Sequence, residues 1–129
     1  MLKRIAVAFG FVFLLVGVLG FVPGITRDGH LLGIFHVNPA HNFVHLLTGA
    51  AAIACGLTSA HAAQLFFRIF GIVYGLVAVL GFVAGDQPLL GIIANNRADA
   101  WLHTGIAAVS LFLGFAFHEA EAALDRKAV

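Results

Sequence analysis

The chain has 129 residues, of which 61% are hydrophobic and only 10% are charged, and its formal net charge is +1. In soluble domains about a quarter of the residues are charged. This composition therefore excludes an ordinary soluble protein and indicates an integral membrane protein in contact with the lipid bilayer. So small a net charge gives no reason to expect nucleic acid as a partner.

Four segments are long and apolar enough to cross a bilayer, which takes about 20 predominantly apolar residues. They are Ile5 to Val22, Ala40 to Leu57, Leu65 to Ala84 and Ala98 to Phe117. We therefore predict an all-α fold, a four-helix transmembrane bundle, formed by one transmembrane domain over residues 1–129. Residues 118–129 are mixed in charge, and we expect them to extend the last helix into the cytoplasm as a charged tail.

A polar helix entrance occurs twice in this apolar chain, and the second copy lies 58 positions after the first. Asn38 in the first copy corresponds to Asn96 in the second, and His45 corresponds to His103. We expect two tandem helical hairpins, at about residues 5–57 and 65–117, that form a parallel internal repeat about an axis along the membrane normal.

Both entrances carry the residue types that begin helices. Asn38 is followed by Pro39, which suits a helix N-cap with proline at the first helical position. Asn96 is the matching cap, and Asp99, three residues later, resembles the acidic member of a capping box. We therefore predict that Asn38 and Asn96 cap the second and fourth spans.

Positive charges near the span ends predict the orientation in the membrane. One side carries Lys3, Arg4, Arg68, Arg126 and Lys127, and the other carries Arg27 and Arg97. Because cytoplasmic loops are richer in Lys and Arg, we expect both termini in the cytoplasm and both entrances on the outward side.

The entrances also bring polar residues into the spans. His41 and His45 are four residues apart, as are Asp99 and His103, so each pair lies on one helical face. If the two halves pack together, both pairs meet about 10 Å inside the helix starts. Unpaired polar groups are expensive at that depth, so we expect these side chains to face protein or trapped water.

Three interpretations of this outward cluster follow. In the first, His45 and His103 hydrogen-bond across helices or to loop carbonyls, while Asp99 caps a helix and orients His103. In the second, His41, His45, His103 and Asp99 bind zinc, iron or copper as three imidazoles and one carboxylate. In the third, His45 and His103 are the axial ligands of a haem in the Phe-rich interior.

The segment from Phe35 to Gly49, with Asn95 to His103 later in the chain, resembles a bacterial family of small four-span membrane proteins classed as a domain of unknown function. The strings HNxVHLLTG and NRADAWLH carry the resemblance. It implies a four-helix protein of the bacterial plasma membrane and brings no known activity. The positions that define it are His41, Asn42, His45, Asn96, Asp99 and His103.

From these observations we expect a structural or accessory role, as a small subunit that packs against a larger membrane complex or against a second copy in a homo-oligomer. The alternative is a metal- or haem-binding membrane protein that uses the outward cluster. The sequence contains no Gly-rich phosphate loop, nucleophile elbow or pair of spaced carboxylates. An enzyme is therefore expected only if the cluster holds such a centre.

Overall fold

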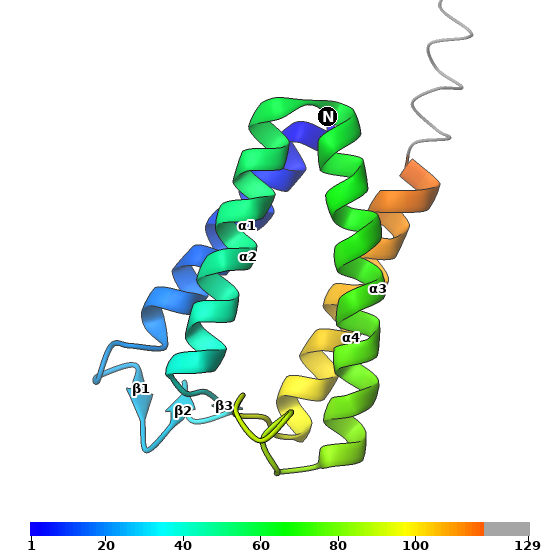
Figure 1. Ribbon diagram of the computed structural model, residues 1–129. Helices are drawn as coiled ribbons and strands as arrows, with labels where there is room; N and C mark the ends of the chain where they lie inside the picture. The colour runs from blue at the N-terminus through cyan, green and yellow to red at the C-terminus, as the bar shows by residue number, and fades with distance from the viewer. Residues whose placement is uncertain (118–129) are drawn as a thin grey trace, which may run out of the picture.

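The computed structural model describes residues 1–117, so the predicted tail at 118–129 lies outside the described residues (Figure 1). Its helices are α1 (Leu2–Leu19), α2 (Pro39–Thr58), α3 (Ala60–Ala84) and α4 (Arg97–Leu111), which the π-helix η1 (Phe112–Ala116) continues. Four stretches, the last being Arg97–Ala116, are long and apolar enough to span a membrane. The chain is a multi-pass membrane protein, and the predicted helical bundle is confirmed.

The helix bounds differ from the predicted spans mainly at the second connection. The sequence suggested that the third span begins at Leu65, but α3 begins at Ala60 and only Ser59 separates it from α2. The Ser59 side chain accepts a hydrogen bond from the backbone N–H of Ala62 at 3.0 Å. This N-cap satisfies a free donor in the first turn, which allows the helix to start so early.

The helices pack as two hairpins, α1 against α2 and α3 against α4. Glycine allows the close approach within the first hairpin. A Cβ atom on Gly10 would lie 2.6 Å from the carbonyl oxygen of Gly49, and a Cβ on Gly49 would lie 2.7 Å from that of Gly10. Small residues at such contacts let backbones meet directly, which favours helix association in lipid.

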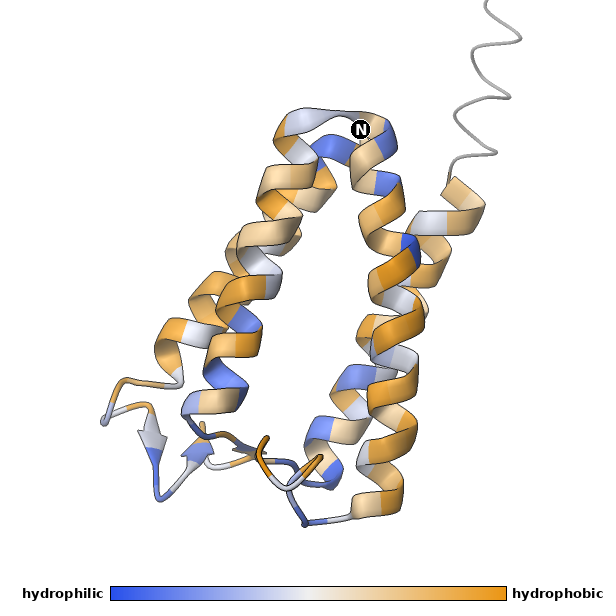
Figure 2. Cartoon of the chain, viewed as in Figure 1, coloured by the Kyte–Doolittle hydropathy of each residue, from blue (hydrophilic) through white to orange (hydrophobic). Residues whose placement is uncertain are grey.

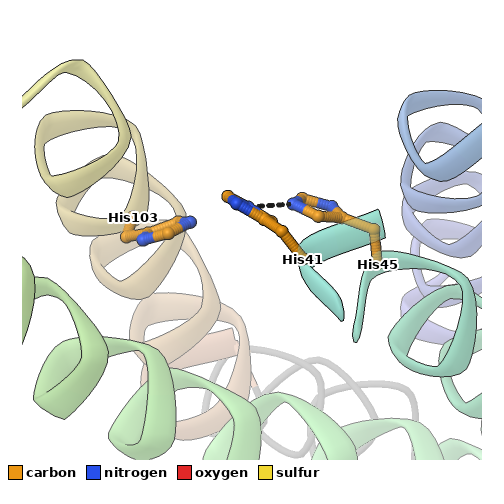
Figure 3. A group of neighbouring side chains, drawn as sticks. All are labelled: His41, His45 and His103. Atoms are coloured by element: carbon orange, nitrogen blue, oxygen red, sulfur yellow. Dashed lines mark hydrogen bonds between the residues drawn. The ribbon is translucent and has the colours of Figure 1, made fainter. Parts of the chain in front are cut away.

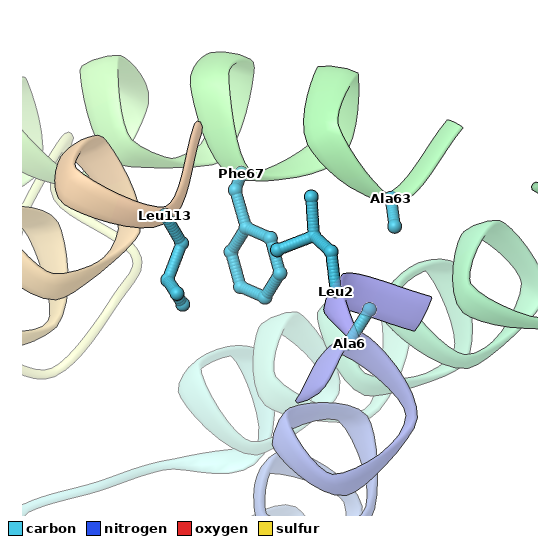
Figure 4. Close-up of a cluster of buried hydrophobic side chains, with 5 residues drawn as sticks. All are labelled: Leu2, Ala6, Ala63, Phe67 and Leu113. Atoms are coloured by element: carbon cyan, nitrogen blue, oxygen red, sulfur yellow. The ribbon is translucent and has the colours of Figure 1, made fainter. Parts of the chain in front are cut away.

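Apolar side chains join the two hairpins. At the end of the bundle that holds the N-terminus and Ser59, here called the turn end, they come from α1, α3 and η1 (Figure 4). The members of this cluster are Leu2, Ala6, Ala63, Phe67 and Leu113. A second, largely aromatic cluster contains Phe13, Phe70, Tyr74 and Ala107. Both clusters connect α1 with α3, whereas α2 and α3 diverge from Ser59 onwards (Figure 1).

The opposite end, here called the loop end, contains a small sheet that the sequence did not predict. Its strands are β1 (Thr26–Arg27), β2 (His30–Leu31) and β3 (Phe35–His36), paired antiparallel in that order. Figure 2 shows hydrophilic residues gathered in this region and apolar residues along the helices. The strands and the loop before α4 therefore lie across the helix starts of α2 and α4, and this layer contains both polar and apolar residues.

Candidate metal centre

The site begins with the two asparagines that start α2 and α4. Asn38 Oδ1 accepts from the backbone N–H of His41 at 2.9 Å, and Asn96 Oδ1 accepts from that of Asp99 at 2.9 Å. The Asp99 carboxylate returns a bond by accepting from the Asn96 N–H at 2.9 Å. Each cap fixes the first turn of its helix, and so fixes where His41 and Asp99 project.

The same asparagines tie the two halves together. Asn38 Nδ2 donates to the carbonyl of Ile92 at 2.8 Å, and Asn96 Nδ2 donates to the carbonyl of Ile34 at 2.8 Å. In each case the acceptor lies in the loop before the other helix. The preceding leucines, Leu32 and Leu90, share the same left-handed backbone, with φ of +54° and +53°. The two asparagine hydrogen bonds hold the starts of α2 and α4 side by side.

Three histidines converge where the helix starts meet. The rings of His41 and His45 from α2 and of His103 from α4 point toward one another (Figure 3). They are only 4%, 5% and 4% exposed, respectively. Each offers one ring nitrogen such that all three nitrogens lie within 4.8 Å of one another. His41 Nε2 and His45 Nε2 are 3.1 Å apart, at hydrogen-bonding distance.

Backbone carbonyls determine which nitrogen of His41 carries the proton. Its Nδ1 lies 2.8 Å from the oxygen of Ala94 and 3.1 Å from that of His36. A carbonyl oxygen can only accept, so Nδ1 of His41 is the protonated nitrogen. In the neutral ring, Nε2 then carries the lone pair, which faces His45. A metal-binding histidine commonly has this arrangement, with the other N–H bonded to a carbonyl.

The other two rings are less constrained. Nδ1 of His45 and Nδ1 of His103 are buried and have no hydrogen-bond partner within residues 1–117. His45 Nε2 lies 3.1 Å from the lone pair of His41 Nε2, so His45 donates this bond and carries its proton on Nε2 in the metal-free protein. Because Nδ1 of His45 has no partner in this range, the proton can move there when Nε2 binds an ion, whereas no contact of Nδ1 fixes the tautomer of His103.

Aromatic rings from α1 and α3, the two helices that carry none of the three histidines, contact the cluster. Phe13 of α1 stacks on His45 with ring centroids 5.1 Å apart, and Tyr74 of α3 meets His103 edge-on at 5.2 Å. Sequence reasoning did not connect Phe13 or Tyr74 with the site. The only signal was their place in apolar spans, which does not show which way a helix faces.

The fourth predicted ligand, Asp99, makes hydrogen bonds of its own. Its side chain is 2% exposed, and its Oδ2 accepts from the backbone N–H groups of Asn96 and His36 at 2.9 and 3.1 Å. The group that meets the spacing of a metal site contains the three histidines without Asp99. The contacts of Asp99 are those of a helix cap that also joins β3 to α4.

The position of the His41 ring bears on the haem interpretation. A haem held by His45 and His103 needs its porphyrin between those two rings. The ring of His41 occupies that position, with its centroid 5.0 Å from that of His45 and 6.0 Å from that of His103 (Figure 3).

Comparison with protein-family models gives a match to a family described as "Domain of unknown function (DUF4383)", over residues 3–116. Comparison with curated proteins and with solved structures gives no match.

Proposed function

The chain belongs to the DUF4383 family, and we propose that it is a membrane protein that binds one transition metal ion through His41, His45 and His103. The observation that supports this proposal is the approach of the three buried ring nitrogens to within 4.8 Å of one another. Zinc binds imidazole nitrogen at about 2.0–2.1 Å, so nitrogens that share an ion lie at most about 4 Å apart. Small side-chain rotations would bring these three to that spacing.

Three imidazoles suit zinc or copper, and they leave a fourth position for water or another ligand. With that position open, the ion can have a chemical role as well as a structural one. His41 Nδ1 donates to two carbonyls, and such bonds hold a metal-binding imidazole in the orientation that its other nitrogen needs. The carbonyls come from His36 and Ala94, so both loops would support one ion.

The distribution of positive charges supports a proposal for the side of the membrane on which the centre lies. Lys3, Arg4 and Arg68 belong to the turn end, and Arg27 and Arg97 to the loop end. Arg126 and Lys127, which also entered the prediction, lie outside the described residues. We propose that the turn end faces the cytoplasm of a bacterial cell, with the centre on the outward side of the plasma membrane.

A zinc titration tests the proposal. The protein, purified without a histidine tag and treated with chelator, is titrated with Zn²⁺ in detergent by calorimetry. We expect about one equivalent to bind to the wild type, and no high-affinity binding in His45→Ala or His103→Ala. His61→Ala is the matched control, because His61 is an exposed histidine at the turn end. Equal binding by all four proteins would overturn the proposal.

The accessory role expected from the sequence remains an alternative proposal. The outer helix faces, with side chains such as Phe11 at 61% exposure, suit a helix of a larger complex or of a second copy as well as lipid. This alternative predicts no stoichiometric metal, so the same titration separates the two.

A further inference from the structure

The small sheet at the loop end carries two histidine side chains that the proposed metal centre does not use. His30 lies on β2 and His36 on β3, and the two are direct partners in the antiparallel register. Residues opposite each other in such a pair carry their side chains on the same face of the sheet, with Cβ atoms about 4.5–5.5 Å apart. The fold therefore places these two imidazoles side by side.

Backbone bonds fix this register. Asp28 and Gly29, which join β1 to β2, have φ of +49° and +75°, as a two-residue turn with an Asp-Gly sequence requires. Val37 donates its backbone N–H to the carbonyl of Gly29 at 2.8 Å, which holds the end of β3 against this turn. The positions of His30 and His36 therefore do not depend on a contact between their rings.

The two rings are stacked and accessible. Their centroids are 5.0 Å apart, and their planes are 11° from parallel. Both side chains are partly exposed, whereas those of the three histidines in the proposed metal centre are at most 5% exposed. An ion in the surrounding water can therefore reach His30 and His36 directly.

Backbone carbonyls occupy one nitrogen of each ring. His30 Nδ1 lies 2.9 Å from the oxygen of Asp28, and His36 Nδ1 lies 3.4 Å from that of Asn95. A carbonyl oxygen can only accept, so in the neutral rings Nδ1 carries the proton and Nε2 carries the lone pair. Within residues 1–117, neither Nε2 has a hydrogen-bond partner. Each ring thus has the arrangement of a metal-binding imidazole with its second nitrogen free.

We propose that His30 and His36 form a second metal site, which binds one divalent transition metal ion such as zinc through their two Nε2 atoms. Nitrogens that share a zinc ion lie at most about 4 Å apart, and small rotations of the stacked rings would bring these two to that spacing. The inference does not rest on the proposed function, because it uses none of the three buried histidines.

The second site should bind more weakly than the buried centre. Two imidazoles leave the remaining coordination positions to water, whereas the buried centre offers three imidazoles. The cation of Arg27, the partner of His30 on β1, also opposes a bound ion, although this side chain is exposed and water and salt weaken the repulsion. The second site should therefore fill after the first equivalent of zinc.

Diethyl pyrocarbonate, which acylates neutral imidazole, tests the second site residue by residue. The full chain, without a histidine tag and in lipid nanodiscs, is treated with this reagent at increasing Zn²⁺, and peptide mass spectrometry gives the rate at each histidine. We expect Zn²⁺ at about ten times its Kd to slow the reaction at His30 and His36 about tenfold, with one shared midpoint, because only the free fraction reacts. His61, exposed at the turn end, is the internal control and should react at the same rate throughout.

Single substitutions show whether the two rings share one ion. In His30→Ala, Zn²⁺ should slow the reaction at His36 less than twofold, and in His36→Ala the same should hold for His30. Both variants keep the backbone bonds of the sheet, so they should fold as the wild type does. His45→Ala should leave the protection of both rings unchanged, so loss of the buried centre and loss of the second site give different results. Wild-type rates that Zn²⁺ leaves unchanged, or protection of one ring that survives removal of the other, would overturn the inference.

Discussion

Asn38 and Asn96 each cap their own helix and bind the loop that precedes the other's helix. Their Nδ2 atoms donate to Ile92 and Ile34, both at 2.8 Å. The two caps therefore fix the relative position of α2 and α4 as well as their starting points. His41, His45 and His103 converge because their helices begin side by side.

Replacing Asn38 separates its two roles. Asn38→Ala removes the cap of α2 and the bond to Ile92, which should lower the free energy of unfolding by about 1–3 kcal/mol. Asn38→Ser keeps a capping oxygen and loses the bond to Ile92, so we expect a loss of about 1 kcal/mol. Reversible denaturation in mixed detergent micelles measures both. Equal losses in the two variants would show that the cap contributes nothing measurable.

Two glycines should respond oppositely to an added methyl group. In Gly10→Ala the new Cβ would lie 2.6 Å from the carbonyl oxygen of Gly49, so α1 and α2 must separate, at a cost of about 1–3 kcal/mol. Gly75 in α3 has no atom within 4 Å of an added Cβ, so Gly75→Ala should stabilise the helix by about 0.5–1 kcal/mol. Thermal midpoints in detergent check this. An unchanged or raised midpoint for Gly10→Ala would contradict the contact between α1 and α2.

Asp99 should affect stability and not metal binding. Asp99→Ala leaves the N–H groups of Asn96 and His36 without their acceptor, and should cost about 1–3 kcal/mol. Asp99→Asn retains an oxygen acceptor and should recover most of that loss. We expect both variants to bind one equivalent of Zn²⁺. If zinc binding is lost in both, Asp99 is a ligand and the four-ligand interpretation of the sequence is right.

The tautomer of His41 can be observed directly. Its Nδ1 lies 2.8 Å from Ala94 O, so we expect ¹⁵N spectra of histidine-labelled, metal-free protein to show His41 protonated at Nδ1. His41→Phe identifies the signal. A His41 ring protonated at Nε2 and not at Nδ1 would mean that its lone pair points at the carbonyls, which would remove it as a ligand in the geometry described.

The features that the sequence predicted depend on local chemistry. Runs of apolar residues indicated the four spans, and Asn38 and Asn96 indicated where two of them begin, because capping involves neighbouring residues alone. The spacing of His41 and His45 on one helical face was also a local property. These predictions needed no knowledge of how the helices pack.

The features that were missed depend on contacts between distant segments. Asp99 could be a cap or a ligand from its position in the sequence, and its bond to the His36 N–H became visible only in the fold. The place of His41 between the other two rings depends on the carbonyl of Ala94, in the other half of the chain. The internal repeat of the two halves stays a prediction.

X-ray absorption at the zinc edge tests the central claim most directly. For protein loaded with one equivalent of Zn²⁺, we predict about three imidazole nitrogens at about 2.0–2.1 Å, with one imidazole fewer in any zinc-bound His103→Ala sample. The His61→Ala control should give the wild-type spectrum. A zinc ion without imidazole ligands, or a spectrum that His103→Ala leaves unchanged, would contradict a metal centre at His41, His45 and His103.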